Sequence, residues 1–171
     1  MNPFEKIDVK QVPGNIFSMF DTGWALISAG DAHKWNTMTI SWGQAGWLWS
    51  RPVVTAYVRK SRHTLGFTEE RERFTISFFA PGECREQLGV LGSKSGRDMD
   101  KMKESGLTPV ALDGEPAFAE ANAVLVCRKV YADWIDPEKF LDRSVFEKAY
   151  PQPEDVHRMY VAEVVSAYVR K

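Results

Sequence analysis

The chain has 171 residues, with 22 lysines and arginines against 23 aspartates and glutamates, so its formal charge is −1 at neutral pH. A protein that binds nucleic acid through phosphate neutralisation carries a marked basic excess, and we therefore expect no nucleic-acid partner. The length suits one domain, residues 1–171, with a sizeable core.

Neither a membrane span nor a metal site is expected. Residues 1–6 lack an apolar signal-peptide segment, and the longest uncharged stretch, 35–50, is too short and polar to cross a bilayer. Cys84 and Cys127 lie far apart, and the three histidines have no ligand spacing. We expect a cytoplasmic protein with reduced thiols.

Strand-like segments dominate the first half of the chain, where β-branched and aromatic residues recur at 24–29, 36–42, 53–58 and 74–79. Two helical segments follow, at 83–91 and 98–104, and the glycine-rich basic loop 92–97 separates them. Strands return at 116–118, 122–134 and 159–169. Because the helices do not alternate with the strands, this order predicts a mainly β, antiparallel barrel with peripheral helices.

Segment 36–42 alternates between two kinds of side chain. The period of two assigns Met38, Ile40 and Trp42 to one face and Thr37, Thr39 and Ser41 to the other. We expect the first face to be core and the second to present small hydrogen-bonding groups.

The run from Arg59 to Thr64 falls where a strand-like segment passes into a helix-like one. A helix N-terminus has unsatisfied backbone N–H groups and a positive dipole end, which favour an anion. Cations and hydroxyls surround this point, and Ser61 or Thr64 is the expected N-cap. Taken alone, the run fits an exposed cap with solvated charges better than it fits a phosphate site.

Common catalytic motifs are absent from the sequence. There is no G-x-G-x-x-G after a strand, no H-E-x-x-H and no G-x-S-x-G, and segment 89–95 lacks the P-loop glycine before its lysine. Six tryptophans occur, and Trp42, Trp47 and Trp49 lie close together. They fit a heavy aromatic core, a dimer interface or a wall for a flat ligand.

Several blocks together resemble a known family: 36–43, 51–54, 57–64, 74–79, 91–98 and 157–160. In this order they are similar to the flavin reductase-like FMN-binding proteins, including the flavoredoxin branch. The resemblance implies a split β-barrel of antiparallel Greek-key type. The family's reductases often have H-x-x-x-x-G at the last strand, whereas this chain has Ala162 at the glycine position, which puts the shape of the nicotinamide pocket in question.

The resemblance also implies FMN as cofactor, held near the interface of a homodimer. The implied flavin-lining residues are Asn36, Thr37, Met38, Thr39, Ser41 and Trp42. The implied phosphate-binding residues are Arg59, Ser61, Arg62, His63 and Thr64. The resemblance implies that the loop adds Lys94, Ser95 and Arg97, facing the cofactor of the same subunit or of the other one. His157, at the start of the last strand, is a catalytic candidate or a gate.

Two functions fit these features. One is an enzyme that transfers hydride from NADH or NADPH to the flavin and passes electrons to an acceptor. The other is a flavoredoxin-like carrier that exchanges electrons with a redox protein partner and does not itself use NAD(P)H. A structural protein with a vestigial pocket is a third interpretation.

Overall fold

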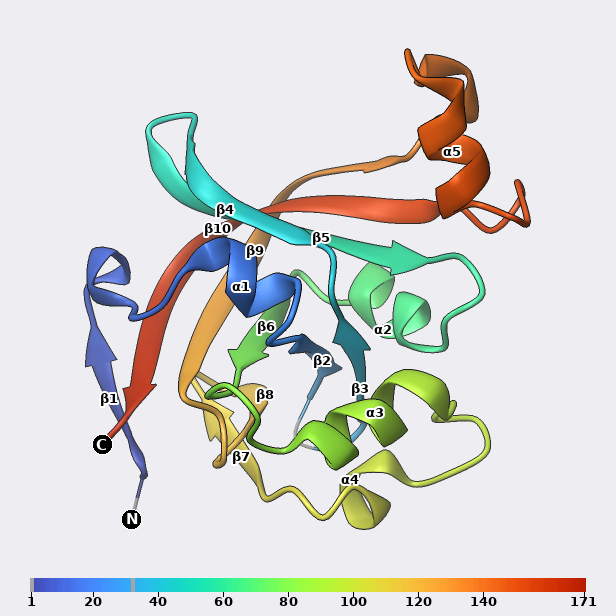
Figure 1. The fold of residues 1–171 in the computed structure, drawn as a ribbon. Helices are drawn as coiled ribbons and strands as arrows, with labels where there is room; N and C mark the ends of the chain where they lie inside the picture. Colours follow the sequence, from blue (N-terminus) through green and yellow to red (C-terminus); the bar gives the residue numbers. More distant parts are fainter. Residues whose placement is uncertain (1, 32) are drawn as a thin grey trace.

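The computed structural model describes residues 2–31 and 33–171, and an eight-stranded antiparallel sheet forms its centre (Figure 1). Seven strands follow the order β3-β2-β6-β9-β10-β5-β4, and β1 pairs with β10. Their bounds are β1 Phe4–Ile7, β2 Ala25–Gly30, β3 Trp35–Ile40, β4 Gly43–Leu48, β5 Arg51–Arg59, β6 Arg73–Phe78, β9 Ala123–Trp134 and β10 His157–Arg170. A separate hairpin consists of β7 Pro109–Leu112 and β8 Glu115–Phe118.

Short helices occupy the periphery of the sheet (Figure 1). They are η1 Val9–Gln11, α1 Ile16–Phe20, α2 Thr64–Glu70, α3 Arg85–Ser93, α4 Lys101–Glu104, η2 Pro137–Lys139 and α5 Arg143–Ala149. The described part of the sheet does not close, because β3 and β4 remain edge strands. The fold is therefore a split β-barrel, which confirms the predicted class.

The barrel packs two apolar clusters. One fills the interior and includes Ile27, Phe74 and Tyr160, all fully buried. The other lies beneath α3 and includes Leu88 and Phe118. Burying an apolar side chain of this size stabilises a fold by about 1.5–3 kcal/mol, so these clusters hold the sheet in its curved form.

Segment 36–42 differs from its prediction in two respects. The strand ends at Ile40, and Trp42 lies beyond it with 45% of its surface exposed. The threonine face is also not free, because Thr39 Oγ1 donates to Leu88 O at 2.6 Å and Thr37 Oγ1 donates to Ile27 O at 3.1 Å. Covering by α3 makes both faces of β3 largely buried.

The helix expected at 98–104 forms only one turn. Asp100 ends the preceding loop and accepts from the backbone N–H groups of Met102 and Lys103, so α4 begins at Lys101. The other helix starts two residues later than expected, because Cys84 has a left-handed backbone with φ of 54°.

The described residues contain no group of three or more His, Cys, Asp or Glu side chains arranged to hold a metal ion. Within the same residues, no helix is long and apolar enough to span a bilayer.

Gly43 permits the close contact between α1 and β4. A Cβ at this position would lie 2.2 Å from the ring of Phe20, which is buried and packs edge-on against Phe78. We expect Gly43→Ala to lower the free energy of unfolding by about 1–3 kcal/mol, measured by urea denaturation. Gly46→Ala is the matched control on the same strand, since a Cβ there meets nothing within 4 Å. Equal stability of the two variants would contradict this role for Gly43.

Candidate functional site

A basic cavity of about 110 Å³ lies where β3, the turn after β5 and the loop after α3 meet. Its lining contains no aspartate or glutamate; it consists of Asn36, Met38, Ser61, Arg62, His63, Thr64, Ser93, Lys94, Ser95, Gly96, Arg97 and Lys101. Segments that are far apart in the sequence thus meet at this cavity, and they bring together most of the residues predicted to bind the phosphate and most of those predicted in the loop. The resulting charge makes the cavity suited to an anion.

Local contacts fix the walls of this cavity. Asn36 Nδ2 donates to Thr64 Oγ1 at 2.9 Å and so ties β3 to the start of α2. A Cβ on Gly96 would lie 2.4 Å from Asn36 Oδ1, so only glycine lets the loop approach β3 this closely. Arg62 Nη1 donates to Gly92 O at 3.1 Å and holds the turn against the end of α3.

The expected N-cap is not formed. His63 occupies the N-cap position of α2 without a side-chain capping bond, while Ser61 bonds elsewhere and Thr64 is already the first helical residue. The prediction of Ser61 or Thr64 as N-cap was therefore wrong. With α2 only seven residues long, cationic side chains rather than a helix dipole give the cavity its charge.

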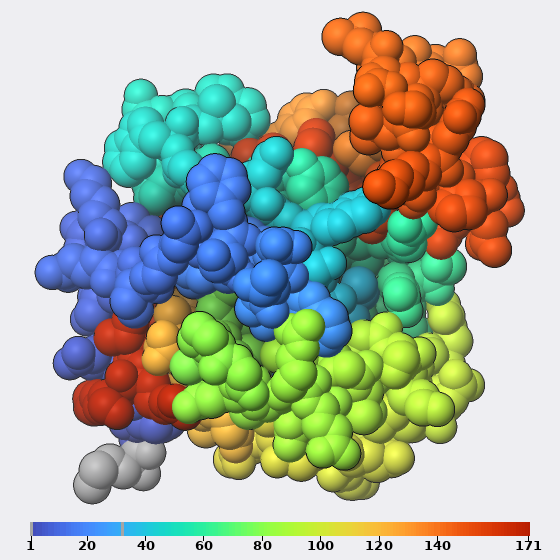
Figure 2. Space-filling view, viewed as in Figure 1, coloured from blue at the N-terminus to red at the C-terminus, as the bar shows by residue number. Residues whose placement is uncertain are grey.

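A second cavity, of about 200 Å³, adjoins the first and shares Met38 and Arg62 with it. Its other lining residues are Thr39, Ile40, Ser41, Trp42, Tyr57, Arg59 and His157. Aromatic rings and the main chain after β3 thus border a space next to the basic cavity. Figure 2 shows that segment 136–155, in orange, projects from the surface above the yellow-green α3–α4 region.

Arg59 faces this second cavity and not the basic one. Its guanidinium donates to Ala149 O at 2.9 Å and Asp155 O at 3.2 Å, and it lies 5.2 Å from the centre of the Tyr150 ring. Asp155 also accepts from the backbone N–H and the hydroxyl of Ser61, at 2.8 and 2.9 Å. Arg59 and the Ser61 hydroxyl are therefore hydrogen-bonded to the segment before β10.

His157 lies in the wall of the second cavity and is only 7% exposed. Its Nδ1 is 2.8 Å from Tyr150 Oη, and its ring centre is 4.9 Å from that of Trp42. Burial, together with the nearby Arg59 charge, lowers the pKa of His157 to about 4. The imidazole is therefore neutral at neutral pH, and it can orient a ligand by hydrogen bonding but holds no extra proton to deliver.

Ala162, the position that departs from the family's usual glycine, is fully buried in the core. It pairs with Val54 of β5 next to a β-bulge and lines none of the cavities described here. Its methyl group fills barrel interior rather than site volume.

Sequence reasoning missed Lys101, the one buried lysine in the cavity wall. Nothing in its local pattern marks it, because it stands among charged residues in a segment that reads as an exposed helix. The burial results from contacts with β3 and α3, which are distant in sequence.

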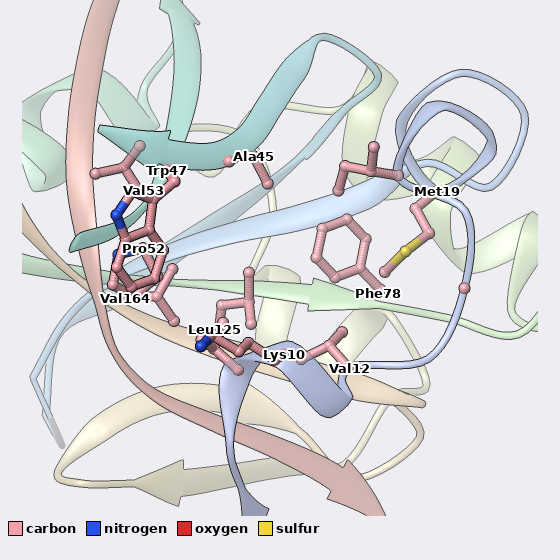
Figure 3. Close-up of a pocket in the computed structure, with 14 residues that line it drawn as sticks. Lys10, Val12, Met19, Ala45, Trp47, Pro52, Val53, Phe78, Leu125 and Val164 are labelled. Atoms are coloured by element: carbon pink, nitrogen blue, oxygen red, sulfur yellow. The ribbon is translucent and has the colours of Figure 1, made fainter. Parts of the chain in front are cut away.

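An apolar cavity of about 260 Å³ lies elsewhere, between the N-terminal segment and the β4–β5 hairpin (Figure 3). Val53, Phe78, Leu125 and Val164 line it from four strands of the sheet, and Lys10 is its one charged lining residue. Without a set of hydrogen-bonding groups, it lacks the means to orient a polar ring.

Comparison with known proteins identifies the family. The model of the flavin reductase-like domain matches residues 17–171. The chain belongs to the flavin reductase-like family. A search of curated proteins found no match.

Several solved structures share the fold of this chain. An FMN-binding domain of a flavin reductase-like enzyme from Shewanella baltica has 20% identity and a TM-score of 0.69, covering 99% of this chain and 78% of the other. Flavoredoxin from Methanosarcina acetivorans has 21% identity and a TM-score of 0.65, covering 98% and 76%. The Streptomyces globisporus NADH:FAD oxidoreductase SgcE6 has 19% identity and a TM-score of 0.66, covering 91% and 79%.

The neutral state of His157 predicts an acid-sensitive contribution to stability. The unfolded chain binds a proton near pH 6.5 but the folded chain only near pH 4, so lowering the pH through this window favours unfolding. Between pH 7 and pH 4, we expect the free energy of unfolding of His157→Gln to fall by about 2–3 kcal/mol less than that of the wild type, measured by urea unfolding. Parallel pH profiles of the two proteins would contradict the lowered pKa.

Proposed function

We propose that this protein is an FMN-binding oxidoreductase that accepts hydride from NADH or NADPH and passes the electrons to an acceptor. The observation that carries the proposal is the adjacency of the two cavities: a basic one without carboxylates and one bordered by aromatic rings, joined at Met38 and Arg62. Their chemistry matches the phosphate and the flat polar ring of FMN. When bound, FMN would supply the capacity to accept a hydride and release electrons.

The residues around each cavity have distinct tasks in this proposal. Arg62, Arg97 and Lys101 neutralise the phosphate, while Thr64 and Ser95 offer hydroxyl groups beside it. Main chain at Thr39 and Ser41 and the indole of Trp42 border the ring. His157, neutral and fixed by Tyr150, orients a ligand at the ring's edge, and Arg59 holds this aromatic cluster to the segment before β10.

Space for a second molecule supports the use of a nicotinamide donor. A third cavity, of about 490 Å³, shares Ser41, Trp42 and Tyr57 with the second cavity, where the flavin ring is proposed to lie. Its other lining residues belong to α1, β4 and their flanks. Hydride transfer requires the two reacting rings to be in contact. This cavity gives a donor ring room to lie next to the flavin ring.

An electron carrier is the second candidate, and the structural likeness to flavoredoxin favours it. A carrier would take electrons from a redox protein partner and leave NADH and NADPH unreacted. Both functions require the same FMN site, so the donor separates them.

The first experiment is the visible spectrum of the purified protein, before and after addition of NADH or NADPH under argon. We expect the absorption of a bound flavin and its bleaching by one of the two nucleotides within the enzyme's turnover time. Free FMN with each nucleotide, in the absence of the protein, serves as the control. Slow bleaching by both nucleotides, with fast reduction by a ferredoxin-type donor, would favour the carrier, and failure to take up FMN would contradict both.

We also propose a cytoplasmic homodimer. An exposed aromatic surface joins the tip of the β4–β5 hairpin to β9, and it consists of Trp47, Leu48, Trp49, Val130, Tyr131 and Trp134. Trp49 and Ser50 have φ of 51° and 57°, although hairpin turns of this kind favour asparagine and glycine. A large apolar residue kept at a strained, exposed turn supports a surface that a second copy covers.

Trp49→Glu tests this surface, because a charge there must be desolvated in the interface. We expect the wild type to sediment as a dimer and the variant to shift toward monomer at micromolar concentration. Leu141→Glu is the control, since Leu141 is fully exposed and lies just before α5. Figure 1 shows α5 away from the tip of the β4–β5 hairpin. If Trp49→Glu formed a dimer with the same dissociation constant as the wild type, the interface would lie elsewhere.

A further inference from the structure

The apolar cavity of Figure 3 adjoins the third cavity, because Ile16 and Ala45 line both of them. The third cavity in turn shares Trp42 and Tyr57 with the second cavity, where the flavin ring is proposed to lie. A row of three adjoining spaces therefore leads from the flavin ring, between α1 and β4, to the apolar interior of the barrel.

The far end of this row suits an apolar group. Phe78, Leu125 and Val164 line it; they belong to the interior cluster of the barrel and are 2–8% exposed. Lys10 is the one charged residue among the described residues of its lining, and its ammonium lies 5.6 Å from the centre of the Trp47 ring, where a cation is favourably placed. Apolar walls of this kind favour an apolar ligand over water.

The third cavity differs from the apolar one, because it presents polar groups beside aromatic rings. Tyr57 Oη donates to Gln44 Oε1 at 3.4 Å, so Gln44 has its amide N–H groups to offer to an oxygen of a ligand. Asp21 is the one charged residue among the described residues that line this cavity. An uncharged ring with carbonyl oxygens suits it, whereas the Asp21 carboxylate repels an anion.

We propose that the electron acceptor is an uncharged quinone with an apolar side chain, whose ring enters the third cavity and whose side chain fills the apolar cavity. The inference rests on the proposed function, because it requires electrons from a bound flavin. In the overall reaction NADH or NADPH loses a hydride, which carries two electrons and one proton. The quinone gains these two electrons and two protons, the second proton from water, and becomes the quinol.

The nicotinamide and the quinone use the same space in this proposal. Each ring has to contact the flavin ring beside Trp42, and the third cavity is the space that adjoins it there. The nucleotide therefore leaves before the quinone enters. Initial rates at several quinone concentrations should give the parallel double-reciprocal lines of such an exchange, and converging lines would contradict this placement of the quinone ring.

Binding of two quinones to the oxidised, FMN-loaded protein tests the proposal without turnover. One is 2,3-dimethoxy-5-methyl-1,4-benzoquinone, and the other is the same ring with a decyl chain. Quenching of tryptophan fluorescence gives both Kd values, since Trp42 lines the third cavity and Trp47 the apolar one. We expect the decyl chain to lower the Kd by at least about 100-fold, because each buried methylene raises the affinity several-fold. Equal Kd values would overturn the proposal.

Val12→Phe tests where the apolar chain lies. Val12 follows η1 and reaches into the apolar cavity, and it does not line the third one (Figure 3). We expect a phenyl ring there to weaken binding of the decyl quinone by at least about tenfold and to leave the tail-less quinone within about twofold. Val145→Phe is the matched control, because Val145 is an exposed residue of α5 that lines none of these cavities. Unchanged binding of the decyl quinone by Val12→Phe would overturn the proposal.

Competition by 1-decanol provides a measurement on the wild type should Val12→Phe fold poorly. This alcohol offers the apolar chain without the quinone ring. It should therefore raise the apparent Kd of the decyl quinone and leave that of the tail-less quinone unchanged. Competition with both quinones, or with neither, would overturn the proposal.

Reduction of the quinones separates this inference from the proposed function. With FMN and the nucleotide that bleaches it, the decyl quinone should be converted to its quinol with a KM at least about tenfold below that of the tail-less quinone. If the nucleotide bleached the flavin but neither quinone reoxidised it under argon, the acceptor would be another compound and the proposed function would stand. Failure to take up FMN would refute the proposed function itself.

Discussion

The antiparallel pairing of β5 with β10 determines the positions of the groups at the site. In this register Arg59, the last residue of β5, lies opposite His157, the first residue of β10. The same register continues past the strands, because Lys60 N donates to Val156 O at 3.1 Å. The turn that borders the basic cavity and the aromatic cluster around His157 are therefore built on one ladder, and a shift by one residue would separate them.

Asp155 divides the positive charge of this region in two. Its carboxylate accepts a hydrogen bond from the Ser61 hydroxyl and lies 3.9 Å from the Arg59 guanidinium. It therefore compensates the positive charge of Arg59 beside the second cavity. No comparable carboxylate lines the basic cavity, where Lys101 and its neighbours remain uncompensated. An anionic ligand is therefore attracted to one end of the site, while the other end presents rings and a neutral imidazole.

Local sequence patterns were sufficient to predict the barrel and most of its strands, but not β1, β4 and β7 or the partners of the site residues. The alternation in 36–42 identifies a strand, yet whether the threonine face is covered depends on α3, about fifty residues later. The Arg59–Asp155 contact joins residues 96 positions apart. The local run from Arg59 to Thr64 cannot reveal this partner, and by itself it predicts a phosphate role for Arg59. The burial of Lys101 likewise results from two carbonyls on other elements.

The contact between Gly43 and Phe20 connects the fold to the proposed chemistry. Phe20 anchors α1 in the core, and the missing side chain at Gly43 lets β4 pass directly beneath it. This packing keeps α1 at the side of the third cavity, whose wall includes Phe17 with 81% of its surface exposed. Since an electron carrier needs only an exposed edge of its cofactor, a preformed apolar space next to Trp42 favours a function in which a second ring lies against the flavin.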